Sequence, residues 1–544
     1  MKITFLGATH QVTGSRTLVE WLDGRYFLVD YGMEQGEENE FEQQELPVAP
    51  SAIEHVFVTH AHIDHTGLLP LLCKQGFRGI IHSTPETENL CSIMLADSAH
   101  IQETDAVSET KKNLRKGGPT VEPLYTKEDV EAVMKLFQPC EYGKVYMIDE
   151  GLSVRFTDAG HLLGSSFIEF FLEEEGVQKT LVCSGDVGNT NQPIICDPKS
   201  IAEADYLLIE STYGTRLHER KTEPIPALVG ILRRTFQRGG TVVIPSFAVG
   251  RTQELLYYFR EIKQHRLLPE YQDFPVYVDS PLASEATAIF LQCSKECLDE
   301  DATRIMDQGQ NPIWFDGLRT TVSADDSKAL NDTPESKVII SSGGMCEGGR
   351  IRHHLKHTIW NPRNTIMFAG YQAVGTLGRT IYEGAKTVKI YGEVIDVNAE
   401  IVLLEGMSGH ADKQGLLNWI DGFTVRKPGF VFVNHGDDPS CTAFAQEVTD
   451  RFGIPANAPY SGCEYDLAKG EWIRLTEPVR RKKKAAYHDS GAEQGSSPSK
   501  IRNKLFLQLR AAVEALDQYT MGLAGHSNDE LSKLTQKIRD LIHH

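Results

Sequence analysis

Four side chains that commonly bind metals fall within six residues near the N-terminus: His60, His62, Asp64 and His65. Imidazole nitrogens and carboxylate oxygens are the ligands that a borderline cation such as zinc prefers. A lone histidine is usually a surface residue or a satisfied core residue, but a cluster this dense is costly without a cation. The cluster therefore predicts a metal site that faces two cations, one on either side of a single loop.

Further candidates of the same type recur later in the chain, each after an apolar run. They are His161 in DAGHLLGSS, Asp186 in CSGDVGN and His435 in FVNHGDD. Each alone is weak. Their shared position supports the cluster, because binding residues are commonly carried on loops at the ends of a rigid scaffold.

The apolar runs that precede these residues predict buried strands. In the first part of the chain the runs are YFLVD ending at Asp30, HVFVT at Thr59, TLVCS at Ser184 and YLLIES at Ser211. The segment from Pro85 to Lys112 has a helical pattern. Strands and helices in this order predict an α/β or layered αββα arrangement.

A second α/β region follows from about residue 213 to 400. Its strand-like runs are GTVVIPS, PVYVDS, KVIISS and NTIMFAG. The chain then returns to the earlier pattern of a strand followed by a polar turn, in EIVLLEGMSGHAD and FVFVNHGDD. The second region is therefore predicted to interrupt one domain.

The order of Asp30 in LVDYGM, HAHIDH, AGHLLGS, SGD and a late histidine resembles the metallo-β-lactamase superfamily. Glu210 in IESTYG, His410 in GMSGHAD and His435 in VNHGD resemble three extra motifs of its β-CASP branch. That branch contains the nuclease subunit of the pre-mRNA cleavage and polyadenylation factor, its bacterial relatives and RNase J. The resemblance implies an αββα sandwich from residues 1–212 and 401–475, with a β-CASP domain inserted at 213–400.

The resemblance also implies two Zn²⁺ per chain and a role for each motif residue. His60, His62 and His161 would hold one zinc. Asp64, His65 and His435 would hold the other, with Asp186 as the bridge. Asp30 would lie beside the site and orient a ligand or the water, although it could equally cap the end of its strand.

Two cations that share a water lower its pKa, so that a hydroxide can attack a phosphorus bound across them. The leaving ribose oxygen then needs a proton. His410, oriented by Glu210 as the resemblance suggests, is the candidate general acid, and the alternative is a buried structural histidine.

Two glycine-containing elements of the inserted region are candidates for holding the RNA backbone. Ser341, Ser342, Gly343 and Gly344 lead to Arg350, and free backbone amides at a helix start suit phosphate oxygens. Arg251, in PSFAVGR, lies in a segment that also resembles a β-CASP motif. The alternatives are a plain tight turn for the first element and domain packing for the second.

Single-stranded RNA is the predicted substrate, and the predicted reaction is phosphodiester hydrolysis. Relatives with the same metal motif act on thioesters, lactams or lactones, but they lack the long insertion. DNA-processing members of the branch typically carry Val where His435 lies. A non-catalytic scaffold of this family would lack some of the metal ligands, whereas this chain has every expected ligand residue. The GHAD and NHGDD versions of the β-CASP motifs resemble the polyadenylation-factor type, which favours internal cutting of RNA. 5′–3′ exonuclease action stays open.

Composition adds weaker constraints. The 544 residues carry a net charge of -20, which is unpromising for a polyanion partner, yet residues 480–544 carry 12 Lys and Arg against 7 Asp and Glu. Scattered cysteines without a CxxC pair, no long apolar run and no signal peptide predict a cytoplasmic protein without a membrane span. A basic linker at 476–500 and a helical hairpin at 501–544 are predicted. They could form an RNA-holding arm, an element for dimerisation or partner contact, or a solvated tail, and homodimer formation is the prediction that we favour.

Overall fold

Two β-sheets carry the strands that the apolar runs predict. The structure is a computed structural model in which residues 1–36, 40–218 and 223–481 are described, and Met1–Arg481 forms one compact unit. The first sheet has the order β23 (Glu471–Arg474), β22 (Glu464–Asp466), β1 (Lys2–Gly7), β2 (Arg16–Leu22), β3 (Arg25–Tyr31), β4 (Ile53–Phe57), β5 (Ile80–Ser83), β6 (Phe137–Pro139). The second has the order β21 (Ala456–Asn457), β20 (Phe430–Asn434), β11 (Tyr206–Glu210), β10 (Val177–Cys183), β9 (Ser166–Glu174), β8 (Leu152–Asp158), β7 (Val145–Asp149).

The two sheets pack face to face through an apolar core. Phe27 and Phe57 of the first sheet and Phe170 of the second are fully buried there. The ring of Phe170 lies 4.8 Å from that of Phe27 and 5.0 Å from that of Phe57, measured between centroids. Aromatic pairs at this spacing add to the apolar area that they bury. The core therefore fixes the strand ends of one sheet against those of the other.

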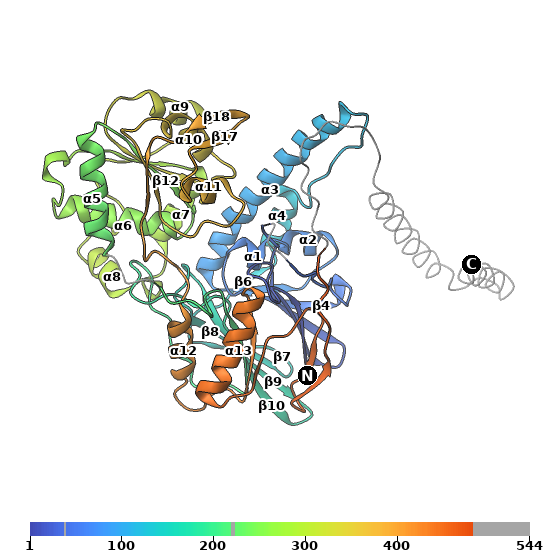
Figure 1. The fold of residues 1–544 in the computed structure, drawn as a ribbon. Helices are drawn as coiled ribbons and strands as arrows, with labels where there is room; N and C mark the ends of the chain where they lie inside the picture. The colour runs from blue at the N-terminus through green and yellow to red at the C-terminus, as the bar shows by residue number, and fades with distance from the viewer. Residues whose placement is uncertain (37–39, 219–222, 482–544) are drawn as a thin grey trace. The chain divides into compact units, whose positions relative to one another are not determined.

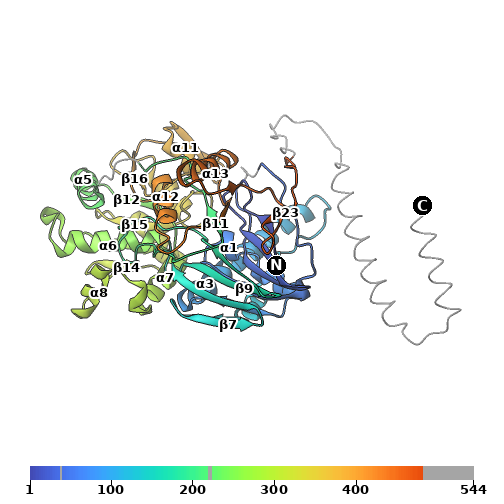
Figure 2. The same ribbon diagram turned by 90° about the horizontal axis from the view of Figure 1, so that it is seen from below.

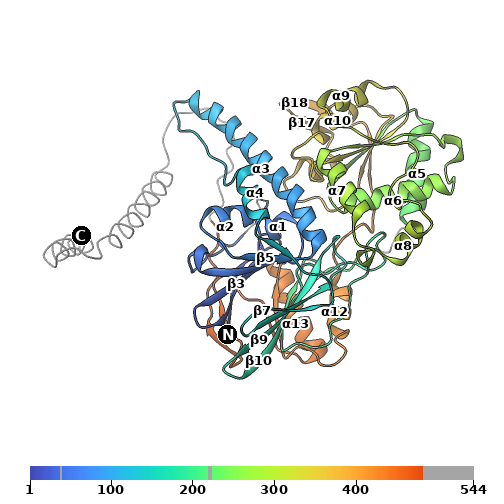
Figure 3. The ribbon, with the colours of Figure 1, turned by 180° about the vertical axis from the view of Figure 1, so that it is seen from behind.

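Helices cover the outer faces of both sheets. Against the first lie α1 (Ile63–Thr66), α2 (Leu69–Lys74), α3 (Pro85–Leu114) and α4 (Lys127–Met134), and against the second lie α12 (Lys413–Asp421) and α13 (Asp438–Phe452). The orange α12 and α13, late in the sequence, lie beside the early strands (Figures 1 and 3). The predicted αββα sandwich is confirmed.

The inserted region forms a third, all-parallel sheet. Its order is β14 (Leu318–Thr320), β13 (Val276–Asp279), β15 (Val338–Ser342), β12 (Val242–Ser246), β16 (Thr365–Phe368), β19 (Glu400–Leu403). Its helices are α5 (Pro224–Gln237), α6 (Arg251–Gln264), α7 (Pro281–Gln292), α8 (Glu300–Asp307), α9 (Ala324–Asp332), α10 (Ile351–Thr358) and α11 (Leu377–Tyr382). Figure 2 shows α5, α6 and α8 beside β12 and β14. A small hairpin, β17 (Thr387–Ile390) and β18 (Glu393–Asp396), completes this region.

Strand β19 belongs to the inserted sheet, since Phe368 pairs with Leu403. The chain therefore leaves this sheet a few residues after the boundary expected at residue 400. Backbone hydrogen bonds also join the inserted region to the sandwich, because Asp299 N donates to Ile194 O at 2.9 Å. The predicted helical hairpin, and the linker beyond Arg481, lie outside the described residues. Within the described ranges, the helices are too short or too polar to cross a membrane.

Candidate metal centre

Parallel pairing places the predicted site residues at common sheet edges. In the first sheet, Val29 of β3 pairs with Phe57 of β4, so Asp30 and His60 leave their strands at the same end. In the second sheet, Glu210 of β11 pairs with Asn434 of β20, which brings His435 beside Glu210. The carboxyl ends of parallel strands meet at one edge, and this edge is where ligands bind in open α/β sheets.

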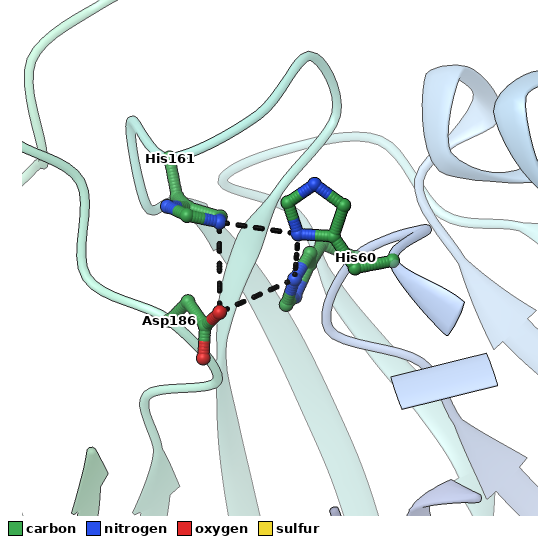
Figure 4. A group of neighbouring side chains, drawn as sticks. His60, His161 and Asp186 are labelled. Carbon is green, nitrogen blue, oxygen red and sulfur yellow. Dashed lines mark hydrogen bonds and ion pairs between the residues drawn. The ribbon is translucent and has the colours of Figure 1, made fainter. Parts of the chain in front are cut away.

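The first group of potential ligands comprises His60, His62, His161 and Asp186, whose ligand atoms all lie within 4.8 Å of one another. Nδ1 of His62 lies 3.0 Å from Nε2 of His60 and 3.3 Å from Nε2 of His161. Oδ2 of Asp186 lies 3.5 Å from Nε2 of both His60 and His161 (Figure 4). Three ring nitrogens and one carboxylate oxygen that converge in this way match a four-ligand metal site.

The second group comprises Asp64, His65 and His435. Nε2 of His435 lies 3.1 Å from Nε2 of His65 and 3.5 Å from Oδ2 of Asp64. Asp186 turns its other oxygen, Oδ1, toward this group, at 3.3 Å from Nε2 of His65 and 3.6 Å from Nδ1 of His435. One carboxylate thus faces both groups.

Burial of the first group favours cation binding. Desolvation lowers the pKa of His60, His62 and His161, which keeps their imidazoles neutral with a lone pair available. Burial acts to raise the pKa of Asp186, but His435 and His65 outweigh it and hold that pKa well below its usual range. Within the described residues, the buried Oδ1 of Asp186 has no hydrogen-bond partner. A buried acceptor without a donor is costly, and a cation would satisfy it. These residues therefore fit a bound metal.

Glu210 and His410 form a pair at the edge of the first group. Nδ1 of His410 lies 3.2 Å from Oε1 of Glu210 and 3.8 Å from Oδ2 of Asp186. The Oε1 atom of Glu210 also accepts a hydrogen bond from the backbone N of Val187 at 2.6 Å, which fixes the carboxylate. Burial acts to lower the pKa of His410, but Glu210 and Asp186 outweigh it and raise that pKa to about 9. The two carboxylates thus favour the protonated form of His410 beside the metal-ligand candidates.

A cavity of about 380 Å³ opens on this centre. His62, His161, Asp186 and His410 line it from the sandwich, and Phe247 and Arg251 line it from the inserted region. Its size lies within the range of small-molecule and cofactor pockets. The two regions therefore share one site.

Comparisons with known proteins match the same regions. The model of the metallo-β-lactamase superfamily matches residues 12–127, that of the β-CASP domain matches 252–381, and that of the Zn-dependent metallo-hydrolase RNA specificity domain matches 394–459. Ribonuclease TTHA0252 of Thermus thermophilus is 36% identical over 446 residues, which cover 82% of this chain and 95% of the relative. The chain belongs to the β-CASP branch of the metallo-β-lactamase superfamily.

Two archaeal relatives of this β-CASP protein extend the comparison. Transcription termination factor FttA of Methanosarcina mazei is 32% identical over 84% of this chain and 70% of its own length. An RNase J-like protein of Methanocaldococcus jannaschii is 31% identical over 85% of this chain and 98% of its own. The predictions of the family, the fold class and a metal-dependent hydrolase are confirmed.

Sequence reasoning missed Thr59, which connects three site residues of this β-CASP protein. Its backbone N donates to Oδ1 of Asp30 at 2.8 Å, and its Oγ1 lies 2.9 Å from Oδ2 of Asp30 and 3.2 Å from Nδ1 of His60. Oδ2 of Asp30 in turn lies 2.7 Å from Nδ1 of His65. Asp30 therefore both binds the strand end and orients a ligand candidate. In the sequence, this role was indicated only by the position of Thr59 directly before His60.

Glycine is required at position 185 because the loop that carries Asp186 passes close to Thr59. A Cβ atom on Gly185 would lie 2.6 Å from Thr59, and the backbone there has a φ of +51°. Two other missed groups fix His161: the carbonyl of Gly409 lies 3.2 Å from its Nδ1, and Oγ of Ser165 accepts from its backbone N at 3.0 Å. Metal-binding histidines usually have such a partner on the second ring nitrogen.

Replacing Thr59 with valine is expected to lower metal affinity or cleavage about 10- to 100-fold, as is typical when a partner that orients ligands is lost. Valine keeps the shape and removes the hydroxyl that links Asp30 and His60. Thr59→Ser keeps the hydroxyl and is the matched control. Metal titration and RNA cleavage rates measure the effect. Equal behaviour of the valine variant and the wild type would show that the hydroxyl has no orienting role.

The candidates for backbone contact divide into two sets. Arg251 lines the cavity, and Gly344 packs against Phe247 at its edge. Ser341, by contrast, is fully buried and donates to the carbonyl of Asp279. Arg350 donates to Oδ1 of the buried Asp279 at 2.7 Å and to the carbonyl of Val322 at 2.8 Å.

Ser341 and Arg350 correct the expectation that these residues contact the RNA backbone. The glycine-rich turn leads Arg350 into an internal ion pair, because the end of β13 presents Asp279 beside it. Ser341 and Arg350 hold the inserted sheet together, and they are left out of the RNA contacts proposed below. Ser342, Gly343, Gly344 and Arg251 stay candidates.

Proposed function

We propose that this chain is a zinc-dependent ribonuclease that hydrolyses phosphodiester bonds of single-stranded RNA with two Zn²⁺. One observation carries the proposal: seven side chains form two ligand groups that share Asp186, with the Glu210–His410 pair beside them. The match to an RNA specificity domain over residues 394–459, which include His410 and His435, supports RNA as the substrate.

The residues of the two groups would each hold one zinc. His60, His62 and His161 would bind the first, Asp64, His65 and His435 the second, and Asp186 both. When bound, two such cations activate water and stabilise the charge that develops on the phosphate.

The protein side chains perform the remaining steps. With Nδ1 held by Glu210, the imidazolium of His410 donates its Nε2 proton to the ribose oxygen that leaves. Glu210 keeps that imidazole charged and oriented. Asp30 and Thr59 hold His65 and His60 in place, and Arg251 contacts the RNA backbone near the cavity. Ser342, Gly343 and Gly344 offer further backbone contacts.

RNA is proposed over DNA because His435 is present, and internal cutting is proposed over purely stepwise removal from the 5′ end. The similarity to a protein named as a ribonuclease over most of both chains supports the substrate. Homodimer formation and a cytoplasmic location stay predictions from the sequence.

Purified protein incubated with 5′- and 3′-labelled single-stranded RNA or DNA is expected to cut RNA and to lose that activity when a chelator is added. End-labelled fragments of intermediate length, seen with either label, would indicate endonuclease action, whereas mononucleotides released from the 5′ end would indicate exonuclease action. Adding zinc back should restore cutting. Cleavage of DNA alone would make DNA the substrate. No cleavage at any metal concentration would indicate a non-catalytic scaffold.

A further inference from the structure

Besides the residues of the metal centre, the cavity has an apolar lining. Leu162, Leu163, Ile194, Val249 and Phe290 contribute to it, and each is buried. Phe247 differs, because 51% of this residue is exposed. A single exposed apolar side chain is common on protein surfaces. An exposed aromatic ring that lines a cavity together with His62, Asp186 and His410 is a different case, because it lies beside the candidate metal ligands.

Phe247 is held through its backbone by its own loop, and its ring lies against the neighbouring loop. It directly follows β12, and its carbonyl accepts a hydrogen bond from Oγ1 of Thr252 at 2.7 Å. Because β12 and β15 are parallel and Ser246 pairs with Ser342, the loops after these two strands lie side by side. A Cβ atom on Gly344 would lie 3.4–3.5 Å from three carbons of the Phe247 ring. The glycine backbone therefore supports the ring from one side.

Arg251 provides a donor in the same lining. Its Nη1 donates to Glu254, but its buried Nε has no hydrogen-bond partner among the residues that the structure describes. A buried donor without an acceptor is costly, and a phosphate oxygen in the cavity would satisfy it. The aromatic ring of Phe247 directly after β12 and the cationic donor of Arg251 at the start of α6, four residues apart, fit the base and the phosphate of one nucleotide.

We propose that the cavity is a subsite for one unstacked nucleobase next to the scissile phosphate, with Phe247 as its stacking platform and Arg251 beside its phosphate. This inference rests on the proposed ribonuclease function. Single-stranded RNA is read mainly through bases that leave the stack and lie on aromatic side chains. Stacking of this kind accepts every base, because each has a π face. The subsite thus selects for a flexible single strand and not for a sequence.

The test combines an RNA lesion with substitutions of Phe247. An abasic ribonucleotide is placed in turn at each position that flanks the mapped cut. For the wild type, loss of the base in the subsite is expected to lower kcat/KM roughly 5- to 150-fold, the usual effect of one lost base–aromatic contact. For Phe247→Ala the same lesion should cost almost nothing, since the platform is already gone. Phe247→Tyr keeps the ring and should keep the sensitivity.

Trp314→Ala is the matched control, because Trp314 is exposed to the same degree, 50%, and does not line the cavity. It should cut both RNAs at wild-type rates. Zinc content and thermal melting of each variant separate a folding defect from loss of the platform. If every abasic position slows the wild type and Phe247→Ala by the same factor, the proposed nucleobase subsite is wrong, and the proposed ribonuclease function is unaffected. If the wild type cuts no RNA at all, both proposals are overturned.

Discussion

Asp186→Asn is expected to abolish RNA cleavage and to release metal from both ligand groups. The carboxylate turns one oxygen to each group, at 3.3–3.6 Å from their ring nitrogens, and is buried among histidines. An amide of the same shape lacks the charge and presents one acceptor oxygen instead of two. The cleavage rate should fall by on the order of 10³ or more, because loss of even one group that stabilises charge at a reacting centre costs about 10²–10³. Metal analysis and RNA cleavage are measured together.

Asp279→Asn is the matched control for this substitution. Asp279 is also a fully buried carboxylate, but it pairs with Arg350 and His354 inside the inserted region. Its replacement should lower the melting temperature and leave the metal content unchanged. If Asp186→Asn keeps both metals, or loses only one, the bridging role of Asp186 is wrong.

His410→Ala is expected to keep both metals and to lower kcat about 10²- to 10⁴-fold, the usual contribution of a positioned general acid. His410 contacts Glu210 through Nδ1 and lies beside the ligand groups, 3.8 Å from Oδ2 of Asp186, so its removal leaves the seven proposed ligands in place. Single-turnover cleavage of labelled RNA measures the effect. Loss of zinc in this variant would make His410 a ligand instead.

The pH dependence tests the same role with a definite sign. A general acid must be protonated, so activity falls as the pH rises through its pKa. The pKa of His410 is about 9 with Glu210 and Asp186 nearby, and bound cations would lower it. Activity is therefore expected to fall with a midpoint at or below pH 9, and this fall is the alkaline limb of the pH profile. Glu210→Gln removes a negative charge that favours the imidazolium, so the limb should move to lower pH. In His410→Ala the limb should vanish.

Much of the sandwich and the residues of its candidate metal centre could be predicted from the sequence. Apolar runs that end in Asp30, Thr59 or Ser211 indicate strands, and the polar residues after them indicate a shared edge. Sequence spacing could not show that the two oxygens of Asp186 face different groups, because that depends on how two sheets pack.

The inserted region was less predictable for a physical reason. A glycine-rich turn before an arginine has the same pattern whether the arginine meets a phosphate or an internal carboxylate. For Arg350 the partner is Asp279, which is 71 residues away in the sequence and reaches it through the order of the sheet. The segment that contains Phe247 was a candidate in the sequence, but only the fold places its exposed ring at the cavity.

The central claim is that two zinc ions share Asp186, and anomalous diffraction at the zinc edge tests it most directly. Crystals of the full chain grown with zinc should give two anomalous peaks on either side of the Asp186 carboxylate. One should lie among His60, His62 and His161, and the other among Asp64, His65 and His435. A single peak, or peaks away from Asp186, would contradict the account.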